Sequence, residues 1–418
     1  MMRRLACHPW VRRILIGACL VIVIVQAAVI AHRRETRIGD YDISREMGRR
    51  FLAGEHLYGG GLHYPYTPSA ALSFAPLALL PPGLGLAMRY AAAVGGLWLT
   101  LRLLRTMVGR RRRLDAATAL SVEIITLVLG AQYILRDLDD GGPHLLLLTI
   151  VVGGVYCLSR GRRLLGAAWL GLATVLKAPV GLLLPFLLWK RQWRPAGLAI
   201  AAALVWTVLP MAWMGPASWW SHEAEWARTA LQSALGNPTP GVRASEQRVQ
   251  NQSLTVAARR YLESYPEGHP LRISHPAYVA FLDLDPAAAR RAGAGIVGVL
   301  VLACAWLMRR PYRGADDPGW LLECSAVLIL ALLLSPVTWL QHLVFVVPAL
   351  YLIAAEGCGR TLGAPALAAM GVYAVPALLL NREVLGKDLS LLILSYHVHT
   401  LALLLVLAVV LLRRPTAD

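Results

Sequence analysis

The sequence predicts an all-α protein that crosses a membrane many times. Hydrophobic residues make up 57% of its 418 residues and charged residues only 16%, and the mean hydropathy is +0.55. Soluble domains carry about 25% charged residues, so this composition excludes an ordinary soluble domain. The apolar residues are gathered in runs, and clusters of arginine lie beside those runs. This pattern is typical of membrane helices with charged cytoplasmic loops.

The net charge of +17 would suggest a nucleic-acid partner in a soluble protein. Here most arginines lie next to apolar runs, so the charge indicates membrane orientation and contact with anionic lipid. We find no nucleic-acid motif and expect no nucleic-acid partner. The six cysteines fall in the apolar runs or on the expected cytoplasmic side, and no CxxC pair occurs. We therefore expect neither disulfides nor a metal site.

Arginine clusters in the short loops set the direction of each span, because such loops lie in the cytoplasm. We expect about twelve spans with both termini cytoplasmic. The run Ala70–Leu80 is too short for a crossing of roughly 20 residues, so we expect it to be a re-entrant or interfacial half-helix. The first run also resembles a signal peptide cleaved near Ala31, and either interpretation leaves Asp40 outside. The expected spans are Ile14–Ala31, Leu84–Leu104, Leu114–Leu135, His144–Ser159, Leu164–Leu176, Pro179–Trp189, Ala196–Met214, Ala292–Met308, Trp320–Leu334, Leu343–Ala355, Leu362–Leu380 and Leu389–Leu412.

The chain is expected to form a single membrane domain, residues 1–418, because it shows neither an internal repeat nor a low-complexity linker. Its two long external loops are expected at 32–83 and 215–290. Prolines in the second loop argue against a long helix there. They are Pro238, Pro240, Pro266, Pro270 and Pro276. The scheme places Arg111, Arg162 and Arg310 in the cytoplasm. It places Asp40, Asn251 and Lys387 outside.

Polar residues gather at the expected outer face. They are Asp40, Asp42, Asp137, Asp139, Asp140, Lys177, Asn251, Gln252, Arg259, Arg260, Gln341 and His342. A transporter would place polar groups near the midplane, often with inverted repeats. An outer-face cluster instead indicates a site between lipid and water. Glu123 and Glu323 lie within expected spans. For these two residues, a role in helix packing or hydrogen bonding and a functional role both stay open.

Each residue taken alone also has a structural interpretation. Loop aspartates are usually solvated, and Lys177 could extend its amine to the interface. However, a lysine near the bilayer centre costs about 2.5–3.5 kcal/mol, so its place between two apolar runs suggests a nearby anion. His342 could be a packed interfacial residue. Asn251-Gln252-Ser253 also matches a glycosylation sequon.

Several motifs occur in a characteristic order. They are Gly54-Glu55-His56-Leu57-Tyr58, Tyr64-Pro65-Tyr66-Thr67-Pro68, Ala75-Pro76-Leu77, Gly141-Gly142-Pro143-His144, Lys177-Ala178-Pro179, Arg191-Gln192-Trp193-Arg194, Asn251-Gln252-Ser253-Leu254 and Ser335-Pro336-Val337-Thr338-Trp339 with His342. This set resembles glycosyltransferase family 87. These integral-membrane enzymes of the GT-C superfamily use polyprenyl-phosphate sugars, typically mannose. The resemblance covers nearly the whole chain.

The resemblance implies a GT-C-like helical bundle and assigns roles to individual residues. The family's catalytic aspartate lies eighteen residues before the tyrosine of its Gly-x-x-Leu-Tyr segment, which is Asp40 here. Asp42, two residues later, is the second candidate carboxylate, so the choice of base between Asp40 and Asp42 stays open. Cations for the donor phosphate would be Lys177, His342 and Arg260. The substrate pocket would contain Tyr58, Tyr64, Tyr66, His144, Asn251, Gln252 and Trp339. This sequence departs from the family at Ser44, His144 and Gln341, where tyrosine, asparagine and a second histidine are common.

The implied reaction transfers a hexose from a polyprenyl-phosphate donor to an envelope glycolipid or glycan acceptor, with inversion and without a cofactor or a metal. The implied location is the cell membrane, with the site on the extracytoplasmic face. Two alternatives stay open: a transporter or lipid flippase, and a non-catalytic scaffold for envelope assembly. Uptake into vesicles would identify the first. The second predicts that loss of Asp40 leaves function intact.

Overall fold

The computed structural model describes residues 9–33, 39–58, 66–110, 114–234, 248–269, 272–273, 275–277, 279–314, 317, 319–359, 362–380 and 382–412. Within these ranges the chain is helical, and its one extended pairing is an isolated bridge between Glu263 and Leu284. The predicted all-α class is therefore confirmed.

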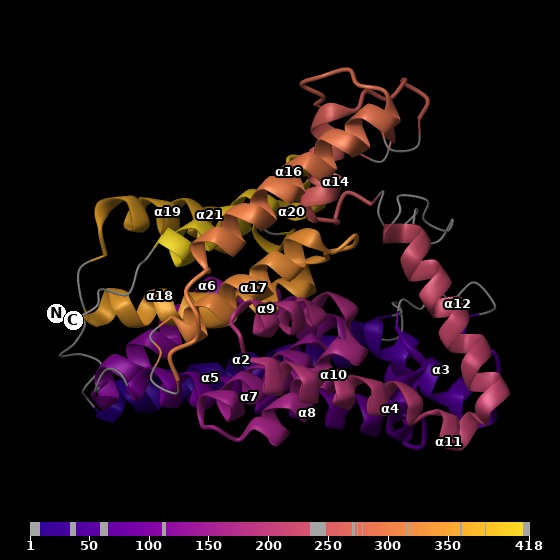
Figure 1. The fold of residues 1–418 in the computed structure, drawn as a ribbon. Helices are drawn as coiled ribbons and strands as arrows, with labels where there is room; N and C mark the ends of the chain where they lie inside the picture. Colours follow the sequence, from indigo (N-terminus) through magenta and orange to yellow (C-terminus); the bar gives the residue numbers. More distant parts are fainter. Residues whose placement is uncertain are drawn as a thin grey trace.

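The N-terminal half forms the lower layer in Figure 1. Its long helices are α2 (Pro9–Arg33), α5 (Pro82–Gly109), α6 (Ala116–Asp140), α7 (His144–Ser159), α8 (Arg163–Leu176) and α10 (Trp193–Val208). Short pieces complete it: η1 (Ala178–Leu182), α9 (Leu183–Trp189) and α11 (Met211–Met214). Helix α8 packs between α7 and α10, and α5 packs against α7.

The C-terminal half lies above this layer in Figure 1. It comprises α14 (Leu254–Leu262), α16 (Pro286–Leu307), α17 (Trp320–Leu334), η2 (Leu340–Val346), α18 (Val347–Gly359), α19 (Ala364–Ala374), η3 (Val375–Leu379), α20 (Arg382–Ser395) and α21 (Val398–Leu412). Helix α6 joins the halves, because it contacts α18, η2 and η3. The hydroxyl of Tyr133 on α6 lies 3.1 Å from Nδ1 of His399 on α21.

Two helices, α3 (Asp40–Ala53) and α4 (Pro68–Ala78), form a shelf beside the bundle. They cross closely at Gly48, where an added Cβ would lie only 2.5 Å from the carbonyl oxygen of Phe74. The hydroxyl of Tyr41 donates to the carbonyl oxygen of Pro82, 3.0 Å away. These contacts fix the N-terminus of α3, and hence Asp40, against the start of α5.

The predicted spans agree with the helices to different degrees. Residues 144–159 and 320–334 form helices with the predicted bounds, and α4 confirms a short helix near residues 70–80. In the part of the chain that the structure describes, five helices are long and apolar enough to cross a membrane, or six if one bent pair counts as a span. Six shorter apolar helices accompany them. The protein is thus a polytopic membrane protein, and the count of twelve stays a prediction.

Three local expectations were wrong. Helix α6 continues through Asp140, five residues beyond the expected end of the span Leu114–Leu135. The second expected external loop contains the 19-residue helix α12 (Pro216–Ala234), which begins at a proline and ends before the prolines that argued against it. The expected last span is two helices, α20 and α21, because the chain breaks at His397, whose φ is +48°.

Candidate active site

Asp40 is the first residue of α3 and is half-buried. Its Oδ2 accepts a long hydrogen bond of 3.4 Å from Nε2 of Gln341 on η2. Burial, and then the neighbouring Asp137, raise the pKa of the Asp40 carboxyl. The Gln341 hydrogen bond and the charges of Lys177 and Arg136 oppose this rise in pKa. Asp40 is therefore a carboxylate with an unusually high proton affinity, surrounded by charged groups.

Asp42 has a different environment. Its Oδ2 accepts a hydrogen bond from the backbone N–H of Gly39 over 3.1 Å, which closes the first turn of α3. Gly39 lies against the end of α6, since an added Cβ would come within 2.8 Å of the carbonyl oxygen of Asp140. Asp42 thus stabilises the helix start that presents Asp40, a common role for a carboxylate in the first helical turn.

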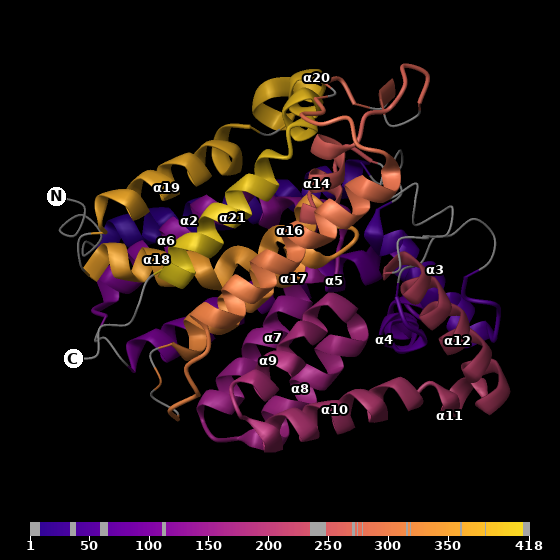
Figure 2. The same cartoon turned by 45° about the horizontal axis from the view of Figure 1, so that its top comes forward.

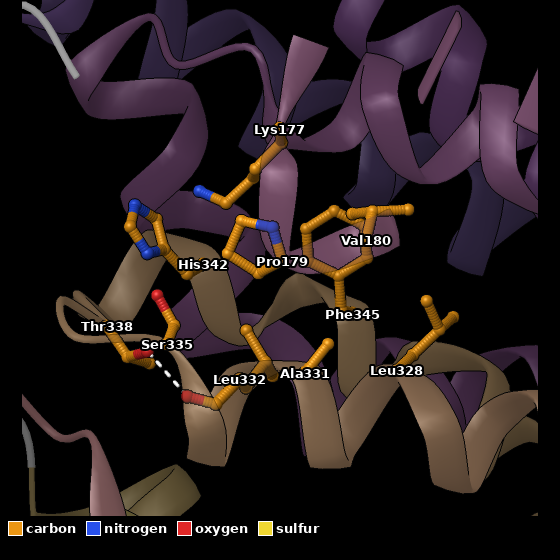
Figure 3. Close-up of a pocket in the computed structure, with 10 residues that line it drawn as sticks. All are labelled: Lys177, Pro179, Val180, Leu328, Ala331, Leu332, Ser335, Thr338, His342 and Phe345. Atoms are coloured by element: carbon orange, nitrogen blue, oxygen red, sulfur yellow. Dashed lines mark hydrogen bonds between the residues drawn. The ribbon is translucent and has the colours of Figure 1, made fainter. Parts of the chain in front are cut away.

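Lys177 lies in the extended break between α8 and η1 and is buried. It lines a pocket together with His342, Ser335 and Thr338 (Figure 3). In Figure 3 the Lys177 amine points toward the His342 ring across this pocket. Burial lowers the pKa of Lys177 to about 7, although Asp40 and Asp137 favour its charged form. The structure thus brings together two of the three residues expected to bind the donor phosphate, Lys177 and His342.

His144 and Asp137 form a buried pair next to His342. Nδ1 of His144 lies 2.8 Å from Oδ1 of Asp137, and both side chains are fully buried. The other Asp137 oxygen, Oδ2, accepts a hydrogen bond of 2.9 Å from the backbone N–H of Leu145, at the start of α7. The rings of His144 and His342 lie 4.4 Å apart. Nε2 of His144 is buried without a partner in the described part of the chain. A histidine held by a carboxylate has a fixed ring orientation, which suits it to hydrogen bonding with a ligand.

Arg89 on α5 was not predicted from the sequence. It is buried, lies 5.6 Å from the centre of the Phe74 ring, and interacts electrostatically with Asp137 and Asp40. Its Nε and Nη2 have no hydrogen-bond partner among the described residues. The signal was present, because an arginine inside an apolar run is a functional candidate by default. Arg89 balances part of the negative charge of the two aspartates.

The tyrosines of the first loop are only partly described. Tyr64 lies outside the described residues. Tyr58 donates to the carbonyl oxygen of Tyr66 over 3.1 Å, so it stabilises the loop. Tyr66 lies edge-on to Phe74 and interacts electrostatically with Asp40. Of the two described tyrosines, Tyr66 is therefore the one that the structure associates with Asp40.

Asn251 and Gln252 make hydrogen bonds to the backbone beside the pocket, and their expected place in the substrate pocket stays a prediction. Both are fully buried. The Asn251 amide donates to the carbonyl oxygen of Pro336 over 2.9 Å and accepts the N–H of Thr338 over 2.9 Å. These bonds fix the segment that lines the pocket at Thr338. Burial of Asn251 also makes it a poor glycosylation acceptor. Trp339 is half-buried under the guanidinium of Arg248, 5.9 Å from it.

Arg260 is not among the residues that line the pocket of Lys177 and His342. It donates to the carbonyl oxygen of Ala277, and its charge acts on His397. Its expected role at the donor phosphate stays a prediction. The two carboxylates within spans form ion pairs: Glu323 with Lys190 at 2.7 Å, and Glu123 with Arg105 at 3.6 Å. A packing role accounts for both.

Comparisons with known proteins identify related sequences. The family model described as "Glycosyltransferase family 87" matches residues 64–336. The chain is 27% identical over 347 residues to a polyprenol-phosphate-mannose-dependent alpha-(1-2)-phosphatidylinositol mannoside mannosyltransferase of Mycobacterium tuberculosis, and this match covers 77% of the chain and 71% of the relative. No solved structure matches the chain.

Proposed function

This chain belongs to glycosyltransferase family 87, and we propose that it transfers a mannosyl group from a polyprenyl-phosphate donor to a hydroxyl of an envelope glycolipid or glycan. Its similarity to a polyprenol-phosphate-mannose-dependent enzyme supports this donor. The donor carries its own activated sugar, so no cofactor and no metal is needed. The site faces the outside of the cell membrane, and both termini are cytoplasmic.

The observation that carries the proposal is the electrostatic interaction of Asp40 with Lys177, which lines the pocket beside His342. Asp40 accepts the proton of the acceptor hydroxyl, and the hydroxyl oxygen attacks the anomeric carbon as the bond from that carbon to the phosphate oxygen breaks. The electron pair of that bond leaves with the lipid phosphate. Lys177 and His342 stabilise its negative charge by charge-assisted hydrogen bonds. Direct displacement inverts the anomeric centre.

The raised pKa of Asp40 suits this role. A general base works best when its pKa lies near the working pH, because it is then both ionised and basic enough to accept the proton. Burial and Asp137 raise the pKa of the carboxyl, and Gln341 limits the rise. Asp42 lacks this role because it stabilises the helix start.

The test is to incubate membranes containing the protein with radiolabelled polyprenyl-phosphate mannose and to identify the labelled product. Transfer of label to a glycolipid or glycan, with the opposite anomeric configuration to the donor, would support the proposal. Label taken into sealed vesicles without a new glycosidic bond would indicate a transporter or flippase instead. Failure to label any product, with membranes in which the protein is folded, would favour a scaffold.

A further inference from the structure

Three basic side chains form a second buried cluster outside the pocket of Lys177 and His342. Arg260 lies on α14, His275 in the external segment that follows it, and His397 at the break between α20 and α21. Their exposed fractions are 6%, 6% and 1%. Figures 1 and 2 show α14 next to α20 at the same end of the molecule. We refer to these three residues as the basic cluster.

His397 is the unusual member of the cluster. Both of its ring nitrogens are buried without a hydrogen-bond partner in the described part of the chain. Its backbone has φ +48°, in the left-handed region that residues other than glycine rarely adopt. A buried polar group without a partner and a residue in a sparsely populated backbone region are both costly, and both concentrate at functional sites. The chain thus places an unpaired imidazole inside the protein.

The charges around His397 favour an anion. Burial, and then the charges of Arg260 and His275, lower the pKa of His397 to about 3. Among the described residues, the charges that act on it include no carboxylate. An anion placed among the three side chains would accept hydrogen bonds from them and would favour the charged form of His397. Arg260 is already oriented, because its guanidinium donates to the carbonyl oxygen of Ala277.

The basic cluster is connected to the wall of the active-site pocket through Gln252. The backbone N–H of Gln252 donates to the carbonyl oxygen of Thr338, which lines the pocket, over 2.8 Å. Its side-chain Nε2 donates to the carbonyl oxygen of Leu394 over 3.1 Å, and its own carbonyl oxygen accepts the hydroxyl of Thr400 over 2.8 Å. Leu394 and Thr400 flank His397. Arg260 lies six residues after Leu254 on α14, about 9 Å along the helix axis at 1.5 Å per residue. Helix α14 therefore links Gln252, which lies just before it, to Arg260.

We propose that Arg260, His275 and His397 bind a phosphodiester of the acceptor glycolipid and thereby orient its sugar toward Asp40. This inference rests on the proposed function. In that reaction Lys177 and His342 take the donor's single phosphate, so a second cationic site fits a second substrate that carries its own phosphate. A phosphatidylinositol mannoside, the acceptor named for the relative, contains such a phosphodiester.

The test measures acceptor binding by the purified full-length protein in detergent, without donor. The probes are phosphatidylinositol mannoside and octyl α-mannoside, which lacks phosphate. The variants are His397→Asn, which tolerates the left-handed backbone, and Arg260→Gln. The control is His269→Asn, because His269 is in the same external segment but stacks on Tyr265. Losing a hydrogen bond to a charged group should weaken phosphatidylinositol mannoside binding by about tenfold or more. Octyl α-mannoside binding and the His269→Asn control should stay unchanged.

Unchanged phosphatidylinositol mannoside binding in both variants would overturn the proposal, and so would an equal loss for both probes. Inorganic phosphate is a second source of the same chemistry. If phosphate alone raises the melting temperature in a His397-dependent way and the lipid shows no preference over octyl α-mannoside, the assignment to the acceptor is overturned. This test measures binding and not transfer. A protein that binds phosphatidylinositol mannoside as expected but does not transfer mannose would therefore contradict only the proposed function.

Discussion

Gln341 donates a hydrogen bond to Asp40 across 301 residues of sequence. The contact joins the shelf formed by α3 and α4 to η2 in the C-terminal half. Gln341 stands where the family often has a second histidine, so in this chain a neutral amide occupies that position. An amide donor favours the ionised carboxylate without adding a charge.

Replacing Gln341 should move the pH dependence of transfer. Because the hydrogen bond lowers the pKa of Asp40, Gln341→Leu should raise that pKa and shift the ascending limb of kcat/KM to higher pH. A long hydrogen bond to a charged group contributes about 1 kcal/mol, so the shift should be about one pH unit or less. The measurement is kcat/KM for transfer against pH. An unchanged limb would show that Gln341 has no influence on the base.

Lys177 should determine the donor KM and how that KM changes at alkaline pH. Lys177→Ala should raise the donor KM about ten- to a hundredfold, since it removes a charged donor to the phosphate. The pKa of Lys177 is lowered to about 7, so its charge is present below that pH and is lost as the pH rises through it. Lys177→Arg keeps its charge and should extend donor binding above pH 8. If neither variant alters the donor KM, Lys177 has no contact with the phosphate.

Arg89 should stabilise the fold through the aspartates it faces. Arg89→Gln leaves Asp137 and Asp40 with less balancing charge, and breaking a buried charge pair can cost about 3 kcal/mol or more. The double variant Arg89→Gln with Asp137→Asn removes both charges, so it should recover part of that loss in melting temperature. Thermal unfolding in detergent measures both. Strictly additive losses would show that the two residues are uncoupled.

The topology makes a separate prediction about exposure. A cysteine at Lys387 should react with a membrane-impermeant thiol reagent in intact cells, whereas one at Arg162 should react only after the cells are opened. The physical reason is the arginine asymmetry of the short loops. Of the described cysteines, Cys157, Cys304 and Cys324 are buried and Cys358 is partly exposed, so labelling of the unmodified protein is the background control. The reverse labelling pattern would invert the scheme.

Much of the helical architecture follows from local sequence. Residues 144–159 and 320–334 have the predicted helix bounds because each is an apolar run with clear polar flanks. The end of α6 could not be predicted this way, since its polar residues suggest a loop. In the structure, Asp137 instead turns inward to accept hydrogen bonds from the start of α7. Only the tertiary fold supplies those partners.

The sequence also predicted part of the candidate site. Asp40, Lys177 and His342 were selected by the family resemblance and by their outer-face positions, and the structure brings them near one another. The contact of Gln341 with Asp40 depends on packing between halves of the chain, which spacing cannot show. The proximity of Arg260 to His397 could not be predicted either, because sequence order gives no distance between segments far apart in the chain.

Comparison of Asp40→Asn with Asp42→Asn tests the central claim most directly. The asparagine keeps the shape of the side chain but cannot accept the hydroxyl proton, so transfer by Asp40→Asn should fall by about 10²–10⁴-fold with donor binding nearly intact. Asp42→Asn should cost far less, because its main role is at the start of α3. The measurement is the rate of mannosyl transfer at matched membrane expression. Loss of transfer in Asp40→Asn alone is the predicted result, and full activity of Asp40→Asn would contradict the account.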